Sequence, residues 1–302
     1  MSSLNLAKEK IGKIEKLIAK EVGRNIREIA SYVEGDLFKA AQSILSAKGT
    51  TIILVTGFYI PKAEIPAAET DGPIGTAHLA KILNILGYDI IVVTDDCCKS
   101  VVSAALDAVG VDCKIETCSV SVNNVMAFIE KIISSHDVSH AVFVERVGST
   151  KDGKFRNMRA LDIGKFTAPL DLIALEPSVV TIGIGDGGNE VGMGKVPFDI
   201  IANSINKGDL IACRVTRDFL IVAGVSNWGA IGLVASLAII SSKESEKLLH
   251  FLTPQMDKKI LKEIVYKGPS VDGVSGKQEI SVDGMPWEIH GRVIEDVLAV
   301  LY

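Results

Sequence analysis

The segment from residue 179 to residue 195, VVTIGIGDGGNEVGMGK, decides the fold that we expect. Apolar β-forming residues lead directly into a loop with six glycines in twelve positions, and the loop also contains Asp186, Asn189, Glu190 and Lys195. Such a glycine density indicates positive φ angles or a close approach of the backbone to a ligand. The N–H groups of such a loop can bind an anion, and its carboxylates can bind a cation or transfer protons. We therefore predict an active-site loop that follows a buried strand.

The same segment matches the G-x-G-x-x-G pattern of dinucleotide-binding folds between Gly183 and Gly188. That pattern requires its third glycine to open a long helix. Two further glycines and Pro197 interrupt any helix here, so we expect no nucleotide cofactor. A phosphate-binding P-loop is also excluded, because Val196 follows Lys195 where that motif needs Ser or Thr.

The composition is typical of an α/β protein. The chain has 302 residues, of which 48% are hydrophobic and only 5% aromatic. Aliphatic runs, which are typical of the buried strands of a parallel sheet, alternate here with helical patterns. We predict a mostly parallel, doubly wound, Rossmann-like sheet with helices on both faces. We assign residues 1–48 to an N-terminal helical segment packed on the main domain, and 49–302 to a single α/β catalytic domain.

The expected strands occupy residues 51–58, 89–94, 113–117, 141–144, 179–183, 211–216 and 219–223. The expected helices lie within 3–47 and at 75–86, 100–109, 122–133, 226–241, 254–266 and 288–301. Ligands of such sheets bind beyond the carboxyl ends of the strands, so residues that follow strands are candidates for the site.

Composition argues against several classes of partner. A net charge of −5 and the absence of a basic run with interleaved aromatic residues argue against nucleic-acid binding. The longest apolar stretch, residues 229–240, is too short to span a bilayer. No secretory signal precedes the charged, amphipathic N-terminus, so we expect a cytoplasmic protein whose five cysteines are reduced. The surplus of aliphatic residues favours a homodimer, and the remaining partner is a small-molecule substrate.

Charged residues follow most of the expected strands: Glu69 and Asp71, Asp95 and Asp96, Glu145 and Arg146, and Asp186 with Glu190. Because Asp71, Asp186 and Glu190 lie near glycines, we interpret them as functional. For Asp95 and Asp96 we favour the capping of the helix that follows.

Residues 145–162 form a long polar segment, which indicates a lid or binding loop rather than a merely solvated one. Its arginines, Arg146, Arg156 and Arg159, could clamp a carboxylate bidentately. Further along, Ser226 is placed to cap the apolar helix that follows it, and Asn227 could line a pocket at the N-terminus of that helix.

These motifs together resemble the D-glutamate cyclase family. The similar segments, in matching order and spacing, are Thr56-Gly-Phe58, residues 69–75, Asn157-Met-Arg159, residues 182–195, residues 223–229 and residues 282–285. The resemblance covers roughly residues 45 to 302, and we expect the cyclase domain alone, without the hydro-lyase-like domain that family members can also carry. It implies conversion of D-glutamate to 5-oxo-D-proline with loss of water.

The implied reaction assigns roles to the candidate residues. The substrate amine must lose a proton before it attacks, and the γ-carboxylate needs a proton donor or a Lewis acid to expel its oxygen. We assign metal binding or proton transfer to Asp186 and Glu190, with Asp71 or Glu69 as a further catalytic carboxylate. The expected substrate-binding residues are Arg159, Lys195, Asn157, Asn189, Gly185, Gly187, Gly188, Ser226 and Asn227.

A hard divalent ion, Mg²⁺ or Mn²⁺, fits oxygen ligands, although the same carboxylates could instead bind the substrate ammonium. Two other interpretations stay open. One is a related lyase or hydrolase for another small amino or hydroxy acid, and the other is a non-catalytic metabolite-binding protein. The density of ionisable residues near the glycine loop favours catalysis.

Overall fold

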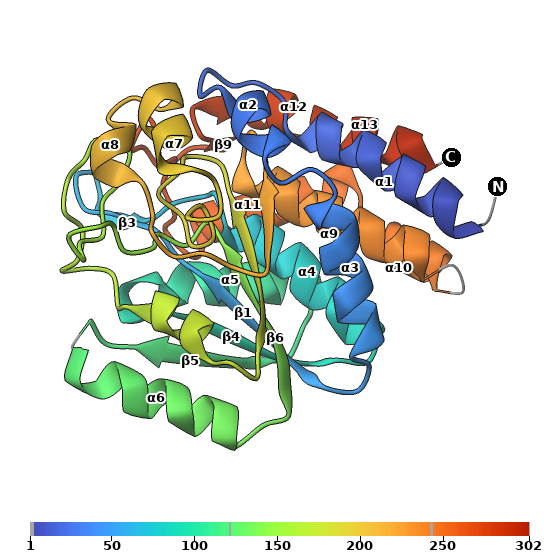
Figure 1. The fold of residues 1–302 in the computed structure, drawn as a ribbon, viewed down its shortest axis with the longest axis horizontal. Helices are drawn as coiled ribbons and strands as arrows, with labels where there is room; N and C mark the ends of the chain where they lie inside the picture. Colours follow the sequence, from blue (N-terminus) through green and yellow to red (C-terminus); the bar gives the residue numbers. More distant parts are fainter. Residues whose placement is uncertain (1–2, 121, 242–243, 302) are drawn as a thin grey trace.

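The computed structural model describes residues 3–120, 122–241 and 244–301, and a six-stranded parallel sheet forms its centre (Figure 1). The strands are β1 (Thr51–Thr56), β4 (Asp89–Asp95), β5 (Lys114–Cys118), β6 (Val138–Val144), β7 (Val180–Gly185) and β8 (Phe219–Val222). They lie in the order β5-β4-β1-β6-β7-β8, and every neighbouring pair is parallel. In chain order this is the doubly wound arrangement, whose winding reverses between β1 and β6. The predicted fold class is confirmed.

The alternation of side chains along the strands explains why helices cover both faces of the sheet. Leu54 and Val92 belong to one buried cluster, whereas their neighbours Val55 and Val93 belong to another. The first cluster includes residues of α4 (Pro73–Ile85), α5 (Lys99–Val109), α9 (Ser226–Ile240) and α11 (Pro254–Tyr266). The second includes residues of α6 (Val122–Ser134) and of the 3₁₀ helix η2 (Leu170–Leu175). A strand that is apolar on both sides is stable only when both sides are covered.

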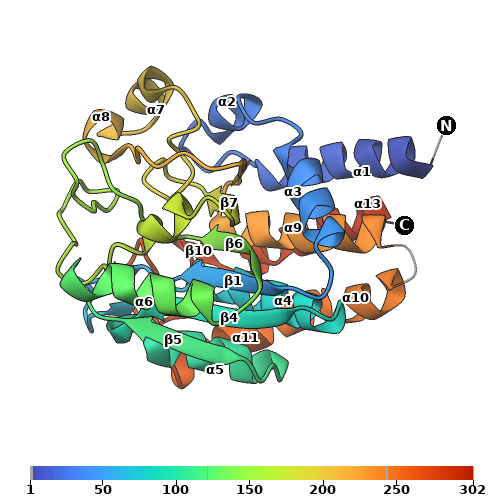
Figure 2. The same ribbon diagram turned by 60° about the horizontal axis from the view of Figure 1, so that its bottom comes forward.

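The N-terminal helices pack against the same core. They are α1 (Ser3–Ile18), α2 (Ile26–Ser31) and α3 (Asp36–Ser46), and Figure 2 shows α1 and α3 beside α9. Ile11, Ile14 and Ile18 of α1 are fully buried in the first cluster. Gly232 of α9 permits this contact, because a Cβ at that position would lie 2.7 Å from the Cδ1 atom of Ile18. The loop between α1 and α2 is thereby held close to the carboxyl ends of the central strands.

The other described elements are short or lie around the sheet. They are β2 (Tyr59–Ile60), β3 (Ala67–Ala68), η1 (Asp96–Cys98), α7 (Phe198–Ser204), α8 (Gly208–Ile211), α10 (Ser245–Phe251), β9 (Ser281–Val282), β10 (Met285–Pro286), α12 (Trp287–His290) and α13 (Arg292–Leu301). None of the helices in the described ranges has the length and apolar character needed to cross a membrane. The five cysteines are all free thiols.

Two of the predicted elements are wrong. Residues 211–216 form no strand, because the N–H groups of Cys213 and Arg214 donate to the carbonyls of Gly188 and Ser149 in neighbouring loops instead of joining the sheet. The predicted helix at 288–301 is interrupted at Gly291, which separates α12 from α13. The first error arises where tertiary contacts override a local apolar pattern, whereas the second lies at a glycine, which is a poor helix former.

Candidate active site

A cavity of about 110 Å³ lies beyond the carboxyl ends of the central strands. This is the edge at which doubly wound sheets bind their ligands, near the point where the winding reverses. Its volume is sufficient for several water molecules or a small polar ligand. The lining consists of four acidic residues, two arginines and six other residues: Glu69, Glu145, Asp186 and Asp283; Arg24 and Arg159; and Phe58, Ile60, Asn157, Met158, Gly273 and Val274.

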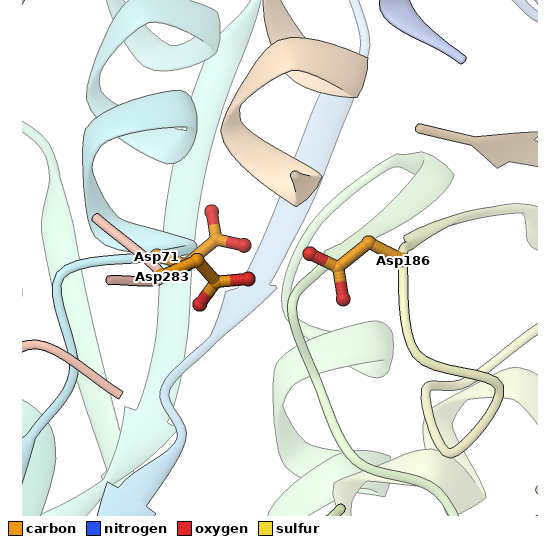
Figure 3. A group of neighbouring side chains, drawn as sticks. All are labelled: Asp71, Asp186 and Asp283. Atoms are coloured by element: carbon orange, nitrogen blue, oxygen red, sulfur yellow. The ribbon is translucent and has the colours of Figure 1, made fainter. Parts of the chain in front are cut away.

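The acidic residues come from separate segments of the chain. Glu69 and Asp71 lie between β3 and α4, Glu145 directly follows β6, Asp186 directly follows β7, and Asp283 lies in the turn between β9 and β10. Figure 3 shows the carboxylates of Asp71 and Asp283 next to one another, with that of Asp186 facing them. The parallel sheet therefore brings together carboxylates that are far apart in sequence.

The carboxylates of the described residues form two overlapping groups that could hold a cation. One consists of Asp71, Asp186 and Asp283, and the other of Glu145, Asp186 and Glu190. Within each group, one oxygen of every residue lies within 4.8 Å of the others. Oxygen ligands in this number suit Mg²⁺ or Mn²⁺, and Asp186 belongs to both groups.

Asp71 is held by the N-terminus of α9. The N–H groups of Ser226 and Asn227 donate to its carboxylate over 2.9 and 2.8 Å. The side-chain oxygen of Asn227 accepts the N–H groups of Gly72 and Gly75, at the start of α4. The positive end of a helix favours an anion, and here that anion is the protein's own carboxylate. Asn227 therefore positions Asp71 and does not line the cavity.

Ser226 is not the N-cap of α9, because Val225 occupies that position and Ser226 is the first helical residue. Its hydroxyl donates instead to the carboxylate of Glu145. Glu145 adopts a left-handed backbone conformation with φ of 45°, which a non-glycine residue seldom adopts. The hydrogen bond from Ser226 helps to hold Glu145 at the cavity in this conformation.

The glycine loop binds Glu190 rather than an external anion. The N–H groups of Asp186 and Gly187 donate to Oε1 of Glu190 over 3.2 and 2.6 Å. A Cβ on Gly185 or on Gly187 would lie within 2.9 Å of an oxygen of that carboxylate, which explains why these positions are glycines. Gly188 has a φ of 87°. The predicted anion-binding loop exists, but its anion is part of the chain.

Other predicted residues have structural partners. Asn189 donates from its side chain to the carbonyl of Arg156, and Lys195 donates to the carboxylate of Asp36. Neither lines the cavity.

Arg159 does line the cavity, and its guanidinium donates to the carbonyl of Val274 over 3.0 Å. Asn157 accepts the N–H group of Arg159 and thereby shapes the turn that presents it.

Arg146 and Asp95 form a buried ion pair away from the cavity. Arg146 donates to both oxygens of Asp95, which also accepts the N–H group of Ala168. Asp95 occupies the N-cap position of η1, but its side chain makes no capping hydrogen bond, and Arg146 is not available to clamp a substrate. Arg156 is also engaged, in an ion pair with the exposed Asp152 and a hydrogen bond to Thr150.

Arg24 was not predicted from the sequence. Its guanidinium donates to Asp186 over 2.6 Å and to Asp283 over 2.8 Å. Glu21 accepts the N–H group of Arg24 and fixes the loop between α1 and α2. The local sequence does not distinguish Arg24 from the exposed Arg27, because its role depends on carboxylates from distant segments.

No role was assigned to Asp283 or Glu145 from the sequence either, although the sequence around each of them indicated one. Asp283 precedes Gly284 in a segment that resembles the family, and Glu145 directly follows a strand. Both have positive φ angles, 52° for Asp283 and 45° for Glu145. Non-glycine residues in this conformation cluster at functional sites, but only the structure reveals their backbone angles.

Burial in a crowded acidic site alters the ionisation of the carboxyls. Desolvation raises the pKa values of Glu69, Asp71 and Glu145 well above the ordinary range. Burial also raises the pKa of Asp186 to about 6 against the opposing effect of Arg24, and it raises the pKa of Asp283 to about 7. The carboxyls cannot all ionise together without a cation. The raised pKa values favour the protonated forms of these carboxyls, and carboxyls of this kind suit proton transfer or the binding of a cation.

We expect the substitution Asp283→Asn to change how stability depends on pH. The pKa of Asp283 is about 7 in the folded protein, against an ordinary value of 3.8. From pH 4 to 7 the folded protein retains a proton that the unfolded chain has released, so the free energy of unfolding falls as pH rises. The variant has no such group. Its stability relative to wild type, measured by urea unfolding, should increase between pH 5 and pH 8.

The matched control is Asp209→Asn, at an exposed position on α8. Its stability difference from wild type should be the same at both pH values. A constant or shrinking difference for Asp283→Asn would contradict the raised pKa of Asp283.

Comparison with known proteins gives two matches. A family model described as "D-glutamate cyclase-like, C-terminal" matches residues 14–298. The human protein "D-glutamate cyclase, mitochondrial" is 30% identical over 326 aligned positions, which cover 97% of this chain and 52% of the human protein. The chain thus spans about half the length of this relative. The range matched by the family model includes Arg24, although the motifs recognised in the sequence began near residue 45.

Proposed function

The chain belongs to the D-glutamate cyclase-like family, and on this basis we propose that it closes D-glutamate into the five-membered ring of 5-oxo-D-proline with loss of water. The strongest structural support is the cavity in which carboxyl groups with raised pKa values lie beside two arginines. Ring closure is intramolecular, so the enzyme has mainly to hold a reactive conformation and to move protons.

The reaction moves two protons from nitrogen to oxygen. The substrate ammonium first loses a proton, and the neutral amine then attacks the γ-carboxyl carbon. A C–N bond forms, a C–O bond breaks, and the departing oxygen leaves as water. We assign the base to Asp186, because Arg24 favours its ionised form. We assign the acid to Glu69, which lines the cavity and is not among the proposed metal ligands, because burial raises its pKa well above the ordinary range and so favours the protonated form that can donate.

Arg159 is the residue that we assign to the substrate α-carboxylate. It lines the cavity, and a guanidinium can bind a carboxylate through two parallel hydrogen bonds. Asn157 supports this role indirectly, since it shapes the turn that carries Arg159. Lys195, which is paired with Asp36, has no part in this assignment.

A divalent ion fits the donor set of the site. Asp186 and Glu190 are the proposed ligands, with Glu145 as a third. Oδ2 of Asp186 and Oε2 of Glu190 are buried and have no hydrogen-bond partner among the described residues. Such an ion, Mg²⁺ or Mn²⁺, would polarise the γ-carboxyl group of the substrate and stabilise the charge that develops on its oxygen.

The function is tested by incubating the full chain with D-glutamate or L-glutamate, in the presence of Mg²⁺, Mn²⁺ or a chelator. Chiral mass spectrometry then follows the dehydrated product. We expect 5-oxo-D-proline from D-glutamate, with a rate that falls when metal is removed. Turnover that is insensitive to the chelator would restrict Asp186 and Glu190 to proton transfer. No product from either enantiomer would refute the proposal and would favour another small amino or hydroxy acid as substrate.

A further inference from the structure

The two carboxylate groups of the cavity share Asp186 but differ in how their charges are satisfied. Arg24 contacts two members of the first group, Asp186 and Asp283. It makes no hydrogen bond or ion pair with Glu145 or Glu190 among those that the structure shows. The guanidinium of Arg24 therefore compensates charge in the first carboxylate group. The second group could hold another cation, and Asp186 is the member of it that Arg24 contacts.

Each member of the first group accepts at least one hydrogen bond from the protein itself. Asp71 accepts N–H groups from Gly72, Ser226 and Asn227, so both of its oxygens have partners. Asp186 and Asp283 each accept a guanidinium N–H from Arg24. A metal ion that bound between these carboxylates would have to displace the guanidinium.

The second group is incomplete without a ligand. Oε2 of Glu190 and Oδ2 of Asp186 are buried and lack partners in the described part of the chain, and the two residues are only 1% and 3% exposed. Glu145 accepts a hydrogen bond from Ser226, but it forms no ion pair within the described ranges. Buried carboxylate oxygens of this kind are costly unless a cation or a proton compensates them.

Arg24 is well suited to act as a permanent cation. A guanidinium stays charged at any physiological pH and presents its donors in a rigid fork, here one N–H group to each of two carboxylates. Its backbone is anchored through the bond from its N–H group to Glu21, and Gly23 donates to the same carboxylate. An ordinary ion could leave this position, whereas Arg24 cannot.

We propose that Arg24 takes the place of a second metal ion, so that the site binds one divalent cation, held by Glu145, Asp186 and Glu190. The proposal extends the function proposed above and rests on its use of a divalent ion. It makes the N-terminal segment a determinant of how many ions the site accepts, and it makes Arg24 a positioning residue for Asp186.

Binding of Mn²⁺ to the full chain, measured by electron paramagnetic resonance, tests the proposal without turnover. Wild type should bind one ion. Glu190→Gln should weaken that binding by at least about tenfold, whereas Asp283→Asn should leave it within about threefold. Arg24→Met should bind two ions, and Arg24→Lys should bind one because it retains the charge. The control Arg27→Met changes an exposed arginine of α2 and should behave as wild type.

Circular dichroism establishes which variants retain the native fold, and the comparison of Glu190→Gln with Asp283→Asn does not require the removal of Arg24. The proposal is overturned if wild type binds no ion or two ions, if Asp283→Asn weakens binding as much as Glu190→Gln, or if a folded Arg24→Met variant still binds only one. Because stoichiometry is read without substrate, a chain that binds one ion but does not cyclise D-glutamate would refute only the proposed reaction.

Discussion

Substitution of Asp186 by Asn is expected to lower the rate of cyclisation by about a thousandfold, within the range measured for the loss of an acid–base group. Asp186 lines the cavity, accepts a hydrogen bond from Arg24, and belongs to both carboxylate groups. An amide of the same shape cannot accept the ammonium proton, and it is a poor ligand for a divalent ion. The fold should persist, because the side-chain volume is unchanged.

The measurement is the initial rate of 5-oxoproline formation, together with urea unfolding of the same preparation. Asp199→Asn, at an exposed position in α7, is the matched control and should retain full activity. If Asp186→Asn retained more than about a tenth of the wild-type rate, Asp186 could not be the base or an essential metal ligand.

Arg146→Met is expected to lower the free energy of unfolding by about 3–5 kcal/mol, the usual cost of removing one partner from a buried ion pair. Arg146 is fully buried, and it donates to Asp95 and to the carbonyls of Gly57 and Ala168. Methionine fills much of the same space but leaves Asp95 without its counter-ion. The expected loss is therefore electrostatic, and it does not arise from a cavity.

Urea unfolding monitored by circular dichroism provides this measurement. Arg156→Met removes a partner of the exposed Asp152 and a hydrogen bond to Thr150, and it should cost less than about 1 kcal/mol because solvent reaches the carboxylate of that pair. Equal effects of the two substitutions would show that burial of Arg146 does not determine its contribution.

Much of the fold was predictable from local pattern. Aliphatic runs such as residues 51–56 indicated buried strands, and the helical patterns between them indicated a parallel, doubly wound sheet. The prediction failed for residues 211–216, where a run of mainly apolar residues bonds to the glycine loop through the N–H group of Cys213. A local pattern does not specify which neighbour will accept a backbone hydrogen bond.

The candidate site was predictable only in part. The rule that ligands bind beyond the carboxyl ends of parallel strands located Glu69, Asp71 and Asp186, because it depends on strand order alone. The same reasoning also placed Arg146 at the site, where the structure shows a buried partner of Asp95 instead. A charged residue after a strand can point to the cavity or into the core, and packing decides between these directions.

The sequence by itself determined the sheet, the glycine loop and the family, since each depends on residues that are close together in the chain. Only the tertiary structure decided that Arg24 lies against Asp186 and Asp283, which are 162 and 259 residues away. The physical reason is that an arginine acquires such a role from the buried carboxylates around it. Arg24 reaches those carboxylates only when the N-terminal helices pack on α9 and the turn between β9 and β10 places Asp283 at the cavity.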